Sequence, residues 1–300
     1  MKTNLFTLVL LAILFAFSTV QAKSKILLRF NVQKGTTYEM NLTSTSNIDQ
    51  EMMGQQMKID QKMEMAFSYL VTDVLPNKNF EIEYSILQMK MDMNINGQSM
   101  SFDSQKPDEN SPMSSVLKSL NSVKVKFEMT PTGHVENVQG LDEFAKQISG
   151  NRQVAQTMQM FSNQENFASF VSQNFNYFPE SEVKKGDKWT ALFKLPALMN
   201  LSTTMNFEAT EITKSAVNLN VTSEVNMESP IEQSGMKMDM KMTGTQTGTM
   251  TIDPKDGWMR NYDLNQKFDM HIKMKNPQSG EDMEIPMTVN STTKIVVNKK

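Results

Sequence analysis

The stretch from Met236 to Ile252 reads MKMDMKMTGTQTGTMTI and alternates strictly between two kinds of side chain. Its even positions hold methionine, glycine, glutamine and isoleucine, and its odd positions hold lysine, aspartate and threonine. Because successive residues of a β-strand point to opposite faces of a sheet, this period of two predicts a strand with one apolar and one polar face. Threonine on the polar side agrees, since β-branched residues favour an extended backbone. We expect Gly244 and Gly248 to let this long strand bend or bulge.

The same alternation recurs on both sides of this stretch. Asn96-Gly97 is the strongest hairpin signal, and a slip in phase near Leu87 predicts a β-bulge. Turns rich in proline, glycine and asparagine separate the alternating segments. We therefore predict a mainly β protein built from long, curved, antiparallel sheets. The alternating segments lie within residues 26–32, 38–42, 63–71, 80–86, 89–95, 123–129, 205–209, 217–221, 268–274, 285–289 and 295–297.

A helical block interrupts the β pattern. Between Leu141 and Tyr177 the apolar residues recur every three or four positions, as on one face of a helix, and Phe178-Pro179 closes the block. The predicted organisation is two related β blocks with a helical insert between them. Its segments are a signal peptide at 1–22, a first β block at 23–140, the helical insert at 141–179 and a second β block at 180–300.

The two β blocks share an order of landmarks, which predicts an internal repeat. The alternative is that Lys-Gly and Pro-Gly turns recur in any β protein, and the sequence leaves open whether the blocks form separate domains or one sheet. The paired landmarks are 34–38 with 185–189, Phe67 and 72–74 with Phe207 and 210–212, 90–93 with 237–240, and 130–133 with 253–257.

The N-terminus and the composition indicate where the protein acts. Lys2, the apolar run from Leu5 to Phe17 and the small-x-small site at 20–22 together predict a cleaved secretory signal. The chain has no cysteine, so we expect a periplasmic or secreted protein without disulfides or a lipid anchor on cysteine. No later apolar stretch is long enough to span a membrane. A net charge of -3 without a basic run argues against nucleic acid as a partner.

The sequence carries no motif that is typical of an enzyme. Its two histidines, His134 and His271, are both expected to be solvated. Gly-x-Ser-x-Gly, His-Glu-x-x-His and phosphate-binding Gly-Lys-Ser/Thr motifs do not occur in it. Acid pairs such as Glu81 and Glu83 lie two apart on predicted strands and are explained as polar rows. We therefore expect a protein that is not an enzyme and that uses neither a cofactor nor a metal.

Methionine is the unusual component, with 28 in 300 residues. Methionine fills irregular cores, forms deformable apolar surfaces that adapt to a ligand, and, as a soft thioether, selects copper(I). We expect a binding protein whose methionine-rich and aromatic sheet face holds an apolar small molecule, a lipid or an envelope protein. The alternatives are a structural or interaction module of the cell envelope without a ligand, and copper(I) binding through the methionine clusters. The candidate ligand-binding residues are Met89, Met91, Met93, Met236, Met238, Met240 and Met242.

Several of these features together resemble a family of exported, uncharacterised proteins from Bacteroidota. The resemblance rests on the signal, the Lys34-Gly35 turn, the segment Thr130-Pro131-Thr132-Gly133-His134-Val135, the helical block and the segment 185–189. It covers most of the mature chain and implies no known activity, so it transfers no functional residues. Long alternating strands with a helical cover are also similar to periplasmic lipoprotein carriers, whose curved sheet holds acyl chains against helices.

Overall fold

The computed structural model confirms a mainly β protein. It describes residues 25–52, 54–106, 124–142, 146, 164–195, 201–233, 236–275 and 282–300. The predicted signal peptide lies outside the described residues, as does most of the predicted helical insert. The described part of that insert contains α5 (Gln164–Gln173), whose apolar face buries Phe167 and Val171.

Twelve antiparallel strands form one sheet in the described part of the chain. Their order across the sheet is β6-β5-β3-β2-β1-β12-β11-β10-β9-β8-β7, with β4 paired to β3. The first and second β blocks therefore meet at the centre, where β1 pairs with β12. The strands are β1 (Thr37–Met52), β2 (Gln55–Val74), β3 (Phe80–Ile95), β4 (Gln98–Asp103), β5 (Lys124–Met129), β6 (Val135–Gln139), β7 (Lys188–Leu195), β8 (Leu201–Ile212), β9 (Val217–Gln233), β10 (Met236–Ile252), β11 (Met259–Lys275) and β12 (Asp282–Lys299).

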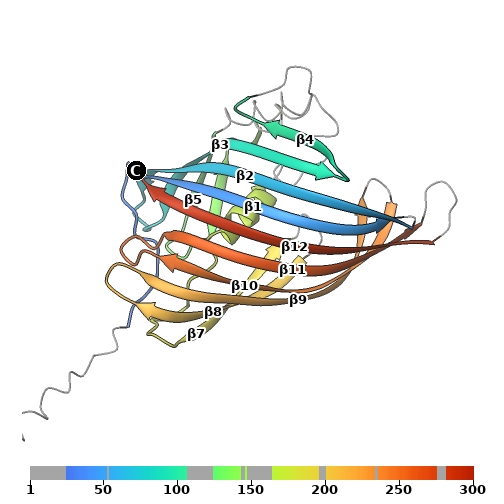
Figure 1. Cartoon of the computed structure of the whole chain (residues 1–300). Helices are drawn as coiled ribbons and strands as arrows, with labels where there is room; N and C mark the ends of the chain where they lie inside the picture. The colour runs from blue at the N-terminus through green and yellow to red at the C-terminus, as the bar shows by residue number, and fades with distance from the viewer. Residues whose placement is uncertain are drawn as a thin grey trace, which may run out of the picture.

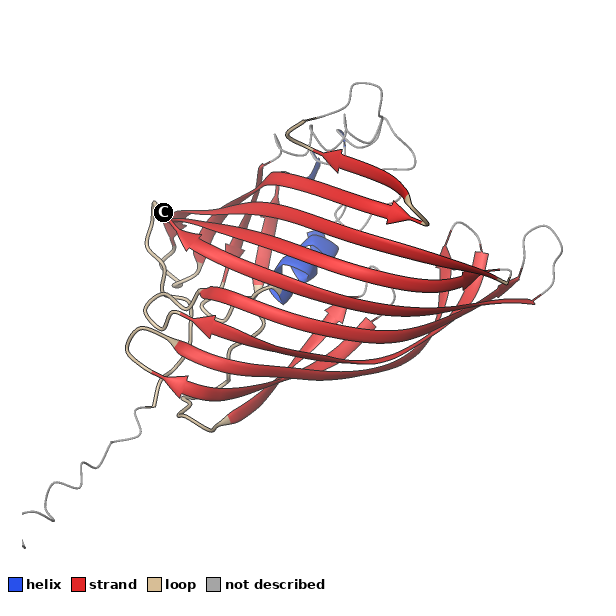
Figure 2. Cartoon of the chain, in the orientation of Figure 1, coloured by secondary structure: helices blue, strands red, loops and turns tan. Residues whose placement is uncertain are grey.

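The sheet is strongly curved, and α5 lies inside the curve (Figures 1 and 2). The helix contacts β6 and β7, which are the first and last strands in the sheet order. It therefore packs between the two edges of the sheet. Covering an edge in this way hides backbone groups that would otherwise be free to pair with another chain.

The stretch that predicted the fold forms β10, with the bounds read from the sequence. Of the bend or bulge predicted at its glycines, the bulge does not occur, because β10 stays in register with β9 and β11 through Gly244 and Gly248. A Cβ atom would lie 2.1 Å from the Lys267 carbonyl oxygen at Gly244, and 2.2 Å from that of Asp263 at Gly248. Glycine is thus needed because the backbone of β11 approaches closely. The strand does bend, together with the whole sheet (Figure 1).

Two other local predictions are confirmed. Asn96 and Gly97 have φ angles of 51° and 89° and form the two-residue turn between β3 and β4. These left-handed conformations are those that a type I′ hairpin turn requires. The predicted bulge also occurs: β2 pairs first with Ile86 and then with Gln88, which leaves Leu87 as the extra residue.

Both β blocks begin with the same hydrogen-bonded turn. The Gly35 N–H donates to the Val71 carbonyl over 2.8 Å, and the Gly186 N–H donates to the Ala209 carbonyl over 2.7 Å. The residue after each acceptor, Thr72 in β2 and Thr210 in β8, interrupts the register. These landmarks of the predicted repeat therefore occupy equivalent positions in the two halves of the sheet.

The predicted landmark that pairs 90–93 with 237–240 is not equivalent in the structure. Counting along the sheet from the Lys-Gly turn of each block, residues 90–93 lie in the third strand, β3, and residues 237–240 lie in the fourth, β10. The counterpart of β10 is therefore β5. The likeness of the two segments reflects a shared alternating composition.

Aromatic rings pack tightly at the end of the sheet where β1 begins, which we call the closed end. Trp258, in the turn before β11, is fully buried and stacks on Tyr38 with ring centroids 4.2 Å apart. Phe30, Tyr69 and Phe175 meet the same indole at centroid distances of 5.6, 5.3 and 5.2 Å. Offset and edge contacts of this kind stabilise beyond the area they bury.

The segment that precedes β1 seals the closed end. Leu28, Phe30 and Val32 alternate and are buried, as their sequence pattern indicates. However, this segment pairs mainly with turns: the Phe30 N–H donates to the Pro131 carbonyl, and the Asn31 N–H donates to the Asp256 carbonyl. Each of these turns contains a glycine with positive φ, and together they form the fourth landmark pair of the predicted repeat.

A buried charge cluster supports the Trp258 turn. The Asp256 carboxylate, 5% exposed, accepts hydrogen bonds from Arg260 over 2.6 Å and from the Tyr38 hydroxyl over 3.1 Å. Arg260 also donates to Asp253 over 2.9 Å. Burial raises the pKa of Tyr38 above its ordinary value, and the nearby Asp256 carboxylate raises it further. The phenol therefore stays protonated and remains a hydrogen-bond donor.

Replacing Trp258 with alanine tests the role of the closed end. Because the indole is fully buried among four other rings, W258A is expected to lower the free energy of unfolding by about 3–5 kcal/mol. Urea unfolding followed by circular dichroism measures this change. The control is V296A on the exposed face of β12, which is expected to change stability by less than about 1 kcal/mol. Equal midpoints for the two variants would contradict this account.

A methyl group at Gly244 tests the close approach of β11. Since the new Cβ would overlap the Lys267 carbonyl, G244A is expected to cost about 1–3 kcal/mol, as overpacking does. Thr245→Ala, at the adjacent exposed position, is the matched control and is expected to cost less. If a differential scanning calorimetry trace shows the same melting temperature for G244A and wild type, the explanation of this glycine is wrong.

Candidate binding site on the inner face of the sheet

The two faces of the sheet differ in chemistry. The inner face, on the side of α5, carries the even positions of β10 and the residues in register with them on neighbouring strands. The outer face carries the charges, as in the ion pairs of Glu64 with Lys62 and Lys90. This is the division into an apolar and a polar face that the alternating sequence predicts.

Coverage of the inner face decreases along β2, β1 and most of β12. At the closed end Tyr38, Met40 and Val297 are buried, with exposed fractions of 0%, 2% and 3%. Farther along the same strands, Ile48 and Met287 also face inward but are only partly covered. The distal half is our name for the rest of the sheet, which begins at residue 46 of β1 and its partners on the neighbouring strands. It extends to the hairpins that join β1 to β2, β9 to β10 and β11 to β12. Most of its inward side chains are partly exposed, whereas Val225, Met240, Met242 and Ile285 are buried, with exposed fractions of 4%, 1%, 6% and 9%.

A row of methionines crosses the distal half. Adjacent strands place these side chains directly opposite one another, and a glutamine occupies the one remaining position. In the order β2-β1-β12-β11-β10-β9, this methionine row is Met57, Gln50, Met287, Met270, Met242 and Met227. Opposed residues of neighbouring strands interact through their side chains, so the row is a band of flexible thioethers that only Gln50 interrupts.

The predicted candidate residues all lie on strands of this sheet. Met238, Met240 and Met242 face inward from β10, where Met240 and Met242 are 1% and 6% exposed. The side chain of Met236 lies outside the described part of the chain. On β3 the candidates at 89, 91 and 93 also face inward, opposite Met65, Met63 and Gln61 of β2, and are partly exposed.

The structure separates the two predicted methionine clusters. Strands β2, β1, β12 and β11 lie between β3 and β10, so the clusters share the inner face without contacting each other across one strand pair. Four methionines of the row, at 57, 227, 270 and 287, were missed because each stands on a different strand. Only the register between strands brings them together, and no local sequence signal reports that register.

A second row, made of neutral polar side chains, marks the start of the distal half. In the same strand order from β2 to β9, this glutamine–serine row is Gln61, Ser46, Ser291, Gln266, Gln246 and Ser223. The Ser291 hydroxyl donates to Gln266 Oε1 over 3.1 Å, and Ser223 shares a hydrogen bond of 2.7 Å with Thr203 of β8. On every strand this row lies four residues from the methionine row, which corresponds to roughly 13 Å.

The distal inner face carries no charge in the described residues. From the glutamine–serine row to the hairpins, the inward positions of β1, β2 and β9 to β12 hold only apolar residues, glycine, serine and glutamine. The charged side chains of these strands point to the outer face. This surface therefore suits uncharged chemistry, since an unpaired charge placed on it would lose hydration without gaining a partner.

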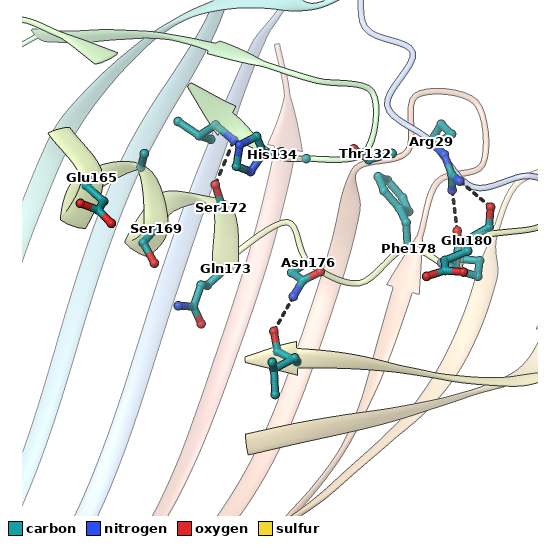
Figure 3. A pocket seen from close by; sticks show the side chains of 15 residues that line it. Arg29, Thr132, His134, Glu165, Ser169, Ser172, Gln173, Asn176, Phe178 and Glu180 are labelled. Atoms are coloured by element: carbon teal, nitrogen blue, oxygen red, sulfur yellow. Dashed lines mark hydrogen bonds between the residues drawn. The ribbon is translucent and has the colours of Figure 1, made fainter. Parts of the chain in front are cut away.

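A separate cavity of about 630 Å³ lies beside α5, between the helix and the turn before β6. Figure 3 shows that Arg29, Ser172 and Asn176 hydrogen-bond to neighbouring elements across it. Arg29 donates to the carbonyls of Pro179 and Glu180, and the Ser172 hydroxyl accepts the Val135 N–H. We therefore interpret this cavity as a crevice between packed elements.

The two histidines are both exposed, as predicted. His134 lies at the rim of the crevice, after the turn glycine, and His271 lies on the outer face of β11. His271 Nδ1 is 3.3 Å from Glu284 Oε1, in a contact open to solvent. Among the described residues, no three His, Cys, Asp or Glu side chains form a group that would hold a metal ion. The described helix also lacks the length and apolar character needed to cross a membrane.

The fold is similar to part of a much larger protein. The structure of lipovitellin, titled for its lipid–protein interactions, matches with a TM-score of 0.50 and 10% identity, over 90% of this chain and 26% of lipovitellin. This chain thus spans about a quarter of that protein, and the likeness concerns the fold alone. OccK7 (OpdD) of Pseudomonas aeruginosa and an outer membrane channel of Pseudomonas putida F1 match with TM-scores of only 0.22 and 0.20. Their identities are 5% and 6%, over 89% and 90% of this chain and 99% and 97% of those channels.

Sequence comparison identifies the family. No curated protein matches the chain. A family model described as a family of unknown function (DUF6263) matches residues 77–259, from the turn before β3 to the first residue of β11. The match covers more than half of the chain and includes α5, β7 and most of the second β block. The protein therefore belongs to the family of unknown function DUF6263.

Proposed function

We propose that this protein binds an apolar small molecule or lipid on the distal inner face of its sheet, and that it acts as a binding protein rather than an enzyme. The observation that carries the proposal is the methionine row, an uncharged band across six adjacent strands whose side chains at Met57, Met270 and Met287 are only partly covered. Covering such surface is favourable by about 25 cal/mol per Å² of apolar area removed from water.

The chemistry of the row favours a flexible ligand. Methionine side chains are unbranched and repack easily around different shapes. A rigid core is better specified by branched and aromatic residues, which is what the closed end contains in Tyr69, Ile82 and Trp258. The contrast within one sheet supports a closed end that stabilises the fold and a distal half that adapts to what it binds.

The comparison with lipovitellin supports lipid as the ligand class. That protein is described by its lipid–protein interactions, and it contains a region with the same fold as this chain. We further propose export to the periplasm or the cell exterior, on the basis of the signal-like segment at residues 1–22. The competing function is an envelope interaction module without a ligand, in which the methionines only pack.

Native mass spectrometry of the mature protein with oleic acid, phosphatidylethanolamine and the uncharged lipid 1,2-dioleoylglycerol tests the proposal. Stoichiometric adducts are expected for wild type. M287D places a carboxylate on the inner face and is expected to weaken adducts by at least about tenfold, since an unpaired charge would have to be desolvated. N290D, on the outer face of the same strand and opposite Lys267, is the matched control and should bind normally.

Circular dichroism and urea unfolding of both variants separate lost binding from lost folding. The milder variant M287Q serves as a second probe if M287D is destabilised. No adduct with any of the three lipids would overturn the proposal and favour the envelope module. Equal binding by wild type, M287D and M287Q would show that the ligand does not bind on the distal inner face, which contradicts the proposed site.

Copper(I) binding is a second candidate, favoured by one observation. Met287, Met270, Met242 and Met227 stand on four adjacent strands at directly opposed positions, and thioether sulfur selects copper(I). This function predicts tight uptake of copper(I) in competition with a chromogenic chelator. M242L/M270L, which nearly conserves volume, should abolish that uptake while lipid adducts remain. Failure of wild type to compete with the chelator ends this alternative.

A further inference from the structure

The glutamine–serine row places polar side chains on a sheet face that is otherwise mostly apolar. Six hydrogen-bonding side chains stand side by side on six strands. The adjoining inward position toward the hairpins is apolar on the same strands, as in Ile48, Val289 and Phe268. Toward the closed end the polar surface continues on β1 and β12 as Ser44 and Thr293, which hydrogen-bond to each other over 3.2 Å. The glutamine–serine row itself adds nothing to hydrophobic burial, so it calls for a separate explanation.

Much of the hydrogen-bonding capacity of the row is unused. Ser291 occupies only the Oε1 atom of Gln266, which leaves the Gln266 amide N–H groups available. Within the described residues, the side-chain amides of Gln61 and Gln246 make no hydrogen bond. All three glutamines are partly exposed. If a pure hydrocarbon covered them, each unsatisfied group would cost roughly 1–3 kcal/mol.

The row matches a neutral partner rather than a charged one. Glutamine amides and serine hydroxyls both donate and accept hydrogen bonds, which suits ester, amide and hydroxyl groups. Among the residues that the structure describes, a carboxylate or phosphate at the row would have no cation beside it on the inner face, because the lysines of β10 and β11, such as Lys241 and Lys267, point outward. The inner face therefore favours amphiphiles with a neutral head group over those with a carboxylate or phosphate.

We infer that the ligand is a neutral amphiphile, with an ester or hydroxyl head group bound at the glutamine–serine row and an acyl chain lying along the methionine row. This inference rests on the proposed function and specifies its ligand class. The head group exchanges hydrogen bonds with Gln246 and Gln266, which face each other directly between β10 and β11. The chain runs toward the hairpins over Met270 and Met287, which are both partly exposed and lie roughly 13 Å from the head group. The row therefore sets both the depth and the direction of the bound lipid.

Three ligands with similar chains test the inference: 1-monooleoylglycerol, oleate and 1-octadecene. Each is supplied to delipidated protein from cyclodextrin, and bound ligand is quantified by mass spectrometry after equilibrium dialysis. Wild type is expected to bind the monoglyceride about tenfold or more tightly than either other ligand, the equivalent of one net hydrogen bond. Q246L/Q266L is expected to lose that preference, with octadecene bound as well as before or better.

Control variants and the possible outcomes keep the two proposals separate. Q56L, on the outer face of β2, should retain the wild-type preference. The ratio of bound monoglyceride to bound octadecene is measured within each variant, so a modest loss of stability does not mimic a loss of preference. If Q246L/Q266L does not fold, the single variant Q266L replaces it. Binding of all three ligands without preference overturns this inference and leaves the proposed function standing. Stronger binding of oleate overturns the neutral class. Binding of none overturns the proposed function itself.

Discussion

The stacking of Trp258 on Tyr38 is the contact on which the rest of the structure depends. It joins the turn before β11 to the start of β1, with the two rings nearly parallel at 10°. Phe30 and Phe175 bring the N-terminal segment and the chain after α5 to the same indole. Because β1 pairs with β12 at the centre of the sheet, this one cluster links the two β blocks, the helix and the segment that seals the end.

This arrangement divides one sheet into regions with different roles. The closed end is packed with aromatic and branched residues and supplies the stability of the fold, because fully buried apolar surface contributes most. The distal half keeps the same alternation of faces but leaves many of its inner side chains partly exposed. The glutamine–serine row stands at the boundary between the two. A sheet anchored at one end is therefore able to present a deformable apolar surface at the other without losing its core.

The local predictions held where the deciding interactions lie close in sequence. The bounds of β10, the Asn96-Gly97 turn and the bulge at Leu87 follow from the alternation of faces and from glycine's access to positive φ. Gly244 was misinterpreted because the carbonyl that excludes a side chain there belongs to Lys267, on a neighbouring strand. The false match of 90–93 with 237–240 had the same origin, since composition does not report position in a sheet.

Local pattern was thus sufficient for the class of fold, for the separation of apolar and polar faces, and for the unusual weight of methionine on the apolar one. Each of these follows from the period of two that an extended backbone imposes on its side chains. The methionine row and the glutamine–serine row required the folded sheet, because Met57, Met287 and Met227 become neighbours in one band only through the pairing of strands far apart in sequence. Strand register depends on long-range packing and hydrogen bonding, and that dependence is why the candidate site emerged only from the tertiary structure.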